Sequence, residues 1–147
     1  MDAVNSRTES LESLLVATNR VIRLAAQTTG STVSSAVWTT LSVLESDGPH
    51  RVGDLARVAR ISQPGMTKVL HGLVEDEWVL RIADVEDSRA WLIAVTDKGR
   101  GALADWRTQL ADATSEIFHD LTEAEWATLT NAAAILGARL NKKAAVA

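Results

Sequence analysis

The sequence of 147 residues contains no cysteine. This absence excludes disulfide bonds, thiolate metal sites and thiol-based redox sensing. Histidine is also scarce, and the three residues of this type, His50, His71 and His119, lie far apart without ligand-like spacing. The sequence therefore predicts no metal site and no cofactor.

Long hydrophobic runs are missing as well. No stretch of about 18 apolar residues could span a bilayer, and no basic segment leads into an apolar run near the N-terminus. We therefore expect a cytoplasmic protein that does not bind membranes.

Sequence motifs typical of enzymes are absent too. There is no glycine-rich phosphate loop, no serine or cysteine nucleophile motif and no pair of metal ligands. The carboxylates lie mostly at predicted helix ends and on polar faces, where helix capping and solvation explain them. We expect that the protein is not an enzyme.

The sequence contains fewer basic than acidic residues. The formal net charge is -4, and an excess of acid weakly opposes binding to phosphate. Residues 49–96 contain 6 basic and 7 acidic side chains. Any case for nucleic-acid binding must therefore rest on local features of the chain.

The spacing of the apolar residues predicts a mainly α-helical domain with a small β-hairpin. Steps of three and four residues predict helices over about 9–27, 35–46, 52–59 and 62–76, and two more in the last third of the chain. Thr122 and Glu125 form a capping-box pattern at the start of the last helix. Between the fourth and fifth helices, residues 78–82 and 90–95 are rich in β-branched and aromatic residues, which is typical of strands.

Two short helices joined by a tight turn and followed by a hairpin indicate a winged helix-turn-helix. In this motif the second helix of the pair enters the major groove of DNA. Lysine can donate to guanine and glutamine can pair with adenine, so a face of short polar and basic side chains suits this role. The candidate face consists of Ser62, Gln63, Gly65, Thr67, Lys68 and His71.

Arginines flank the acidic turn of the hairpin. Arg81 and Arg89 are candidates for contacts with phosphate or the minor groove. Alternatively, they form a solvated edge that pairs with the nearby acids Asp84, Glu86 or Asp87. The near-neutral charge of this segment also leaves open a winged helix that binds only proteins.

The hairpin and the residues after it resemble the MarR family of bacterial regulators. The resemblance is carried by Asp87-Ser88-Arg89 in the turn and by Val95-Thr96-Asp97-Lys98-Gly99 at the start of the next helix. Helix order, loop lengths and total size fit as well.

The resemblance implies a winged helix-turn-helix with a helical dimerisation region. It implies one domain over 1–147, with dimerisation helices at 9–34 and 97–147 and a DNA-binding part at 35–96. It further implies a homodimeric repressor that binds palindromic promoter DNA and is released by a small aromatic or phenolic ligand. Carried over by position, Ser62, Gln63, Thr67 and Lys68 read the groove, Arg89 is the wing arginine and Asp87 orients the wing.

Three positions depart from the family pattern. Gly72 stands near the place of a second basic residue, Glu77 replaces a frequent glycine, and Ile82 replaces a commonly basic wing residue. Each change makes this part of the protein less positive, so we expect modest affinity or an unusual operator.

Five tryptophans are present, and three of them, Trp38, Trp106 and Trp126, lie on apolar helix stripes. Core packing is the expectation for these three rings. Trp38 and Trp106, with Arg20 and Arg23 on the first helix, are also candidates for a ligand site. The alternative for the two arginines is solvation or a contact between subunits.

Overall fold

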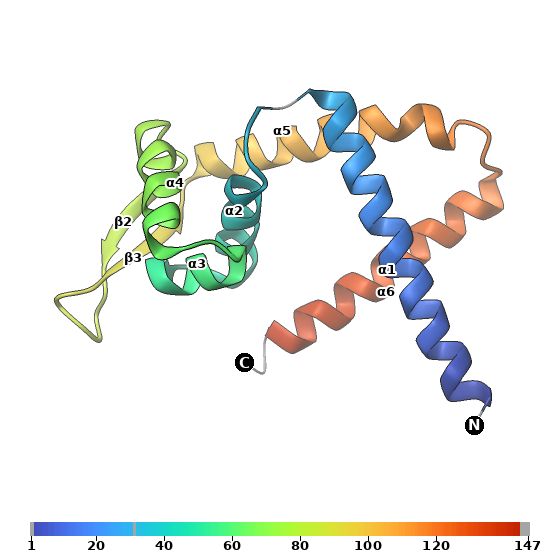
Figure 1. Ribbon diagram of the computed structural model, residues 1–147, viewed down its shortest axis with the longest axis horizontal. Coiled ribbons are helices and arrows are strands. Elements are labelled where there is room, and N and C mark those ends of the chain that lie inside the picture. The colour runs from blue at the N-terminus through green and yellow to red at the C-terminus, as the bar shows by residue number, and fades with distance from the viewer. Residues whose placement is uncertain (1, 31, 145–147) are drawn as a thin grey trace. The chain divides into compact units, whose positions relative to one another are not determined.

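The computed structural model describes residues 2–30 and 32–144, and the side chains of 6–30 and 32–143. The chain forms two compact units, one with the described residues up to Ala113 and one from Thr114 onward (Figure 1). The first unit holds the winged helix-turn-helix and the second holds the last helix.

Most of the first unit is helical. Its elements, in chain order, are α1 (Asp2–Thr29), α2 (Ser35–Asp47), β1 (His50–Arg51), α3 (Val52–Ala59), α4 (Gln63–Glu75), β2 (Val79–Ala83), β3 (Trp91–Val95) and α5 (Asp97–Thr114). The second unit contains the short 3-10 helix η1 (Ser115–Phe118) and α6 (Glu123–Ala144). The mainly α fold with a hairpin wing is as predicted, although α1 begins at Asp2 and not near Glu9.

The predicted hairpin is part of a three-stranded antiparallel sheet with the order β1-β3-β2. Val79 pairs with Val95 at the base of the hairpin, and Ala83 pairs with Trp91 near its tip. The sequence analysis missed β1, in which His50 pairs with Ile93. A strand of two residues is too short to show the alternation that reveals strands in a sequence.

The core lies where α2, α3 and α4 pack against the sheet and the start of α5. Apolar side chains at helical spacing supply it, because each helix buries one stripe. Its most buried members are Leu41, Leu44, Leu55, Met66, Leu70, Leu73, Ile93 and Leu103.

The predicted capping box at the start of α6 is confirmed. The backbone N–H of Glu125 donates to Thr122 Oγ1, and Glu125 Oε2 accepts from the backbone N–H of Thr122 at 2.8 Å. These bonds favour the ionised carboxylate and lower the pKa of Glu125. The expected core packing of Trp126 is wrong, since this residue is 44% exposed; its ring forms an edge contact with Phe118.

The turn after α4 explains why glycine is frequent at the position of Glu77. Glu77 has φ 61°, a left-handed conformation that favours glycine. Thr96 Oγ1 donates to its carbonyl oxygen at 2.6 Å, and Lys98 Nζ lies 3.0 Å from Glu77 Oε2. These contacts from the start of α5 stabilise an unfavourable backbone conformation in the turn.

Gly99 lets α5 start directly against this turn. A Cβ atom at Gly99 would lie 2.1 Å from the carbonyl oxygen of Trp78. That oxygen also accepts from the backbone N–H of Thr96 at 3.0 Å. Only glycine fits here, so Gly99 fixes how closely α5 approaches the end of α4.

We expect Gly99→Ala to destabilise the protein by about 2 kcal/mol or more, because backbone must move to admit the methyl group. Gly101→Ala is the matched control in the same helix, where a Cβ meets nothing within 4 Å. It should be neutral or stabilising by about 0.5–1 kcal/mol, since alanine favours the helix. Urea unfolding measures both variants, and equal effects would contradict the proposed close fit.

Candidate nucleic-acid interface and pocket

The helix α4 begins where the sequence provides a cap. Ser62 is extended, and its Oγ accepts from the backbone N–H of Gly65 at 3.1 Å. Pro64 occupies the first turn, where its missing N–H costs nothing. Gly65 thus serves the cap, and a Cβ there would lie 3.1 Å from Ser62 Oγ.

One face of α4 is buried and the other is exposed. Met66, Leu70 and Leu73 face the core, whereas the predicted groove-reading side chains of Gln63, Thr67, Lys68 and His71 are exposed. The hydroxyl of Thr67 donates to the carbonyl of Gln63 at 3.0 Å, which leaves its lone pairs to accept. The exposed face therefore offers both donors and acceptors to a groove.

Glu75, the last residue of α4, reaches back toward this face. Glu75 Oε1 lies 3.5 Å from His71 Nδ1, one helical turn earlier. This contact is an ion pair only when the histidine is protonated. Among the described residues, the Lys68 ammonium has no ion pair.

The turn of the wing is held by backbone and carboxylate bonds. Asp87 Oδ1 accepts from the backbone N–H of Arg89 at 3.0 Å, and the Asp87 carbonyl accepts from Ala90 at 2.9 Å. Neither Arg81 nor Arg89 forms an ion pair within 2–30 and 32–144. The alternative in which the wing acids neutralise these arginines is therefore not what the structure shows.

The acid Asp84 has a different partner, which the sequence analysis missed. Arg51 donates to Asp84 Oδ2 through Nε at 3.0 Å and through Nη2 at 2.6 Å. The Asp84 side chain is only 6% exposed, and its Oδ1 accepts from the backbone N–H of Glu86 at 2.9 Å. The bond from Glu86 and the arginine together lower the pKa of Asp84. This pair ties β1 to the base of the wing turn.

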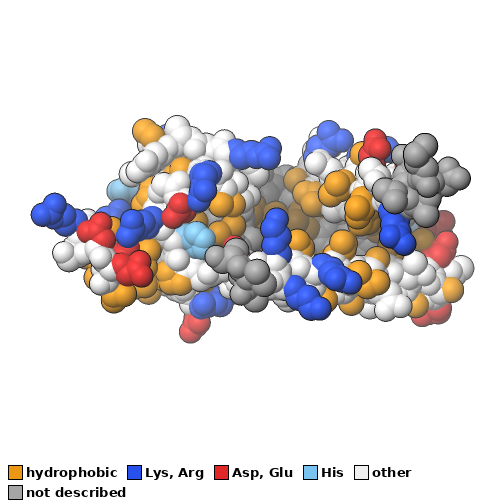
Figure 2. All heavy atoms as spheres, turned by 90° about the horizontal axis from the view of Figure 1, so that it is seen from below, with side chains coloured by type: hydrophobic (Ala, Val, Ile, Leu, Met, Phe, Trp, Pro, Cys, Tyr) orange, Lys and Arg blue, Asp and Glu red, His pale blue; other side chains and the backbone are white. Residues whose placement is uncertain are grey.

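The surface around the wing is mixed in charge. Figure 2 shows Lys and Arg side chains interspersed with Asp and Glu at the end of the molecule that carries the wing. A continuous basic patch is not visible on this face. On this face, positive charge is therefore distributed over separate side chains.

Three tryptophans form a stack inside the first unit. The Trp38 ring lies between Trp106 of α5, at a centroid distance of 4.7 Å, and Trp78, at 5.8 Å. Trp38 Nε1 is buried without a hydrogen-bond partner in the described part of the chain. The stack connects α2, α5 and the turn that follows α4.

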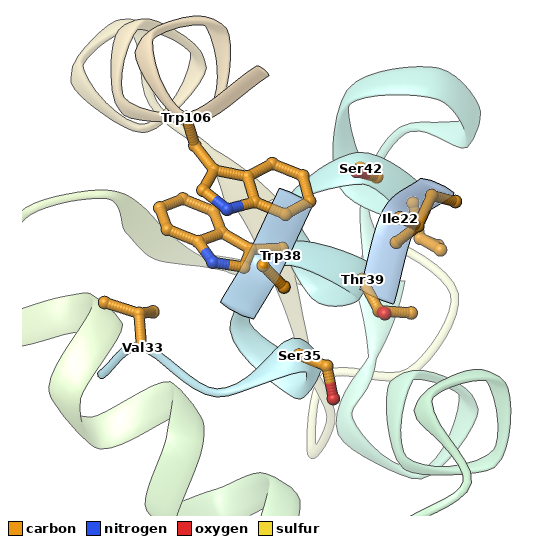
Figure 3. A pocket seen from close by; sticks show the side chains of 9 residues that line it. Ile22, Val33, Ser35, Trp38, Thr39, Ser42 and Trp106 are labelled. Atoms are coloured by element: carbon orange, nitrogen blue, oxygen red, sulfur yellow. The ribbon is translucent and has the colours of Figure 1, made fainter. Parts of the chain in front are cut away.

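A pocket of about 380 Å³ lies beside this stack (Figure 3). Its side chains are neutral and mostly apolar: Ile22, Ala26, Val33, Ser35, Trp38, Thr39, Ser42, Val43 and Trp106. The structure thus brings two of the four predicted ligand residues together. Arg20 and Arg23 instead line a separate shallow surface of α1 with Leu15, Val16 and Asn19.

Other kinds of site find no support among the described residues. Over 2–30 and 32–144, no group of three or more His, Asp or Glu side chains is placed to hold a metal ion. No helix in those ranges is long and apolar enough to cross a membrane.

The fold and this surface define a winged helix-turn-helix protein of the kind that regulates transcription. Residues 33–91 match the model of the MarR family. A Bacillus subtilis (strain 168) protein, described as the uncharacterized HTH-type transcriptional regulator YpoP, is 33% identical over 106 residues, which is 72% of each chain. The chain therefore belongs to the MarR family and is a DNA-binding transcriptional regulator.

Solved structures agree on the fold. The transcriptional regulator Tm0710 from Thermotoga maritima has a TM-score of 0.70 at 18% identity, over 92% of this chain and 96% of the other. Bordetella bronchiseptica BpsR has a TM-score of 0.56 at 21% identity, over 86% and 91%. Its structure concerns the regulation of DNA binding by 6-hydroxynicotinic acid.

We expect Asp84→Asn to loosen the wing at neutral pH, because the ion pair with Arg51 is lost. The lowered pKa means that ionised Asp84 stabilises the fold above its unfolded-state pKa of about 3.9, and that this stability is lost as pH falls through the folded-state pKa. Thermal unfolding from pH 7 to pH 2 measures the difference between wild type and variant. A difference that does not shrink in acid would contradict the role of this carboxylate.

Proposed function

We propose that the protein represses transcription as a homodimer that binds palindromic promoter DNA. The observation that carries this proposal is the exposed face of α4. It presents Gln63, Thr67 and Lys68 beside one another, and no acid occurs from Ser62 to Val74. In this arrangement α4 lies in the major groove, and the wing places Arg89 on phosphate or in the minor groove.

The remaining predicted residues take supporting roles in the proposal. Ser62 and Gly65 cap α4, and a capped N-terminus favours a nearby phosphate. Asp87 holds the backbone of the wing turn at Arg89. His71 also contacts DNA in this proposal. Because Glu75 Oε1 lies near His71 Nδ1, the carboxylate and the DNA compete for contact with the same imidazole ring.

Exposed apolar side chains support the homodimer. Leu11, Leu15 and Ile22 lie at spacings of four and seven residues on α1, and all three are at least half exposed. The helix α6 exposes Leu129, Leu136 and Leu140 at the same kind of spacing. Such stripes on long helices mark association surfaces, since isolated chains rarely leave them in water.

The pocket beside Trp38 supports a ligand. Its neutral, aromatic lining suits a small aromatic or phenolic molecule better than a strongly anionic one. A ligand that displaced Trp38 or Trp106 would act on Trp78, which follows α4 directly. The stack thus offers a physical route from the pocket to the recognition helix.

Lys68→Ala should reduce discrimination between a selected operator and random duplex DNA. Loss of a base contact costs about 1–3 kcal/mol at one position. Arg89→Ala should instead weaken all duplexes alike and lower the salt slope by about one. Fluorescence anisotropy in a salt series measures both effects. Unchanged binding in both variants would favour the alternative, a winged helix that binds proteins.

Leu140→Glu should shift the protein toward monomer, because it places a charge on the apolar stripe of α6. Asn131→Glu adds the same charge on the opposite, exposed face of the helix and should leave the assembly unchanged. Sedimentation velocity reports the oligomeric state. If Leu140→Glu stays dimeric, α6 is not the association surface.

Small phenols should quench or shift the tryptophan fluorescence and release bound DNA together. Trp106→Leu should weaken this response because it removes one wall of the pocket, whereas Trp126→Phe, outside the pocket, should not. Silence across a broad panel of phenols and aromatic acids would contradict the proposed ligand.

A further inference from the structure

One tryptophan takes no part in the ring contacts found among the described residues. Trp91, the first residue of β3, is 57% exposed, more than Trp126 at 44% and far more than Trp38 at 8%. Three other rings form the stack and Trp126 contacts Phe118, but Trp91 has no ring partner in the described part of the chain. A large aromatic side chain that remains mostly exposed is a common feature of binding surfaces.

The sheet register places Trp91 on the face that looks toward α4. Residues two apart on a strand share a face, so Trp91 lies on the same side as Ile93, which is buried. Ile93 pairs directly with Arg81, whose side chain therefore lies on this side too. The indole and the guanidinium are diagonal neighbours on one face of the wing.

These two side chains border a small pocket next to the recognition helix. The pocket has a volume of about 200 Å³ and is lined by Val52, Thr67, Leu70, Arg81, Trp91 and Ile93. Its apolar part comes from Val52, Leu70 and Ile93. Thr67 belongs to the exposed face of α4, so the pocket lies directly beside the proposed groove-reading surface.

The positive charge of Arg81 beside this pocket is not neutralised by an acid of the described part of the chain. Arg81 has no ion pair in the described part of the chain, and the nearest buried wing acid, Asp84, is taken up by Arg51. The Thr67 hydroxyl already donates its hydrogen bond to the carbonyl oxygen of Gln63. The donors left for an incoming group are thus the Arg81 guanidinium and the Trp91 indole N–H.

We propose that Trp91 and Arg81 together hold one sugar-phosphate unit of the DNA backbone, between the groove occupied by α4 and the wing. The deoxyribose packs against the indole and the apolar pocket. The phosphate accepts from Arg81 and from the indole N–H. The inference rests on the proposed DNA binding and adds to it a positioning contact that no base pair distinguishes.

The chemistry of the pocket selects this occupant. An unpaired cation beside an apolar wall matches an anion joined to a sugar ring that presents C–H groups, as in a nucleotide backbone. A paired base stays inside the duplex and cannot enter a pocket at its edge without flipping out. The contact therefore sets affinity and position and leaves sequence preference to α4.

The test uses the full chain and two duplexes of about 30 base pairs, one selected from random sequence by the wild-type protein and one of shuffled sequence. Trp91→Ala should weaken binding to both by about tenfold, the loss expected for one buried contact and its hydrogen bond. Trp91→Phe keeps a ring without the N–H and should fall between wild type and Trp91→Ala. Circular dichroism and thermal unfolding check that each variant is folded.

Two further variants separate the parts of the contact. Arg81→Ala should weaken both duplexes and lower the salt slope by about one, whereas Trp91→Ala should leave the slope unchanged because it removes no charge. Leu80→Ala is the matched control, since Leu80 is 43% exposed on the opposite face of the same hairpin. It should bind both duplexes like the wild type.

Wild-type affinity in Trp91→Ala overturns the inference, and so does a loss confined to the selected duplex, which would make Trp91 a base reader. An equal loss in Leu80→Ala also overturns it, because the effect would then be general to the hairpin. If the proposed DNA binding itself were wrong, the result would differ from all of these, because the wild-type protein would bind neither duplex at low salt.

Discussion

The stacking of Trp38 between Trp78 and Trp106 is the contact on which the arrangement of the first unit depends. Each ring comes from a different part of the chain: α2, the turn after α4, and α5. Aromatic pairs contribute about 0.5–1.5 kcal/mol beyond their buried area. Two such pairs in series hold the end of the recognition helix against the helix that leaves the DNA-binding part.

Gly99 makes this stacking possible. Because it has no side chain, α5 can begin with its backbone against the Trp78 carbonyl. The same approach brings Thr96 and Lys98 to Glu77, whose left-handed conformation they hold. This junction brings together the start of α5, the turn after α4 and one wall of the neutral pocket. The proposed ligand, if it lay beside Trp106, would contact the same aromatic stack that packs against the turn after α4.

The wing follows a different physical logic. It is anchored by one ion pair, Arg51 with Asp84, and by the turn at Asp87, while its two other arginines remain unpaired in the described part of the chain. In a protein of net charge -4, pairing one acid internally matters. The Asp84 carboxylate is thereby held by Arg51 and does not pair with Arg81 or Arg89. Few cations then have to supply the attraction, so we expect affinity to be modest and sensitive to salt.

Local sequence signals predicted the recognition helix well. Ser62 and Pro64 define its start, and the spacing of Met66, Leu70 and Leu73 defines its buried face. The misses are nonlocal: the ion pair joins residues 33 positions apart, and β1 is too short to show a period. Arg20 and Arg23 lie on the predicted helix, but periodicity cannot tell which face of α1 borders a pocket. Trp126 lies on an apolar stripe of α6 that remains exposed in the single chain. An apolar stripe predicts that a helix face is buried, but it does not predict whether the same chain or another molecule covers it.

In the proposed function, two copies of α4 read two symmetric half-sites. Hydroxyl-radical footprinting on a duplex selected by the protein tests it most directly. We expect two matching protected regions whose centres lie about one helical turn, roughly 10 base pairs, apart. A single asymmetric footprint, or no protection at low salt, would contradict it.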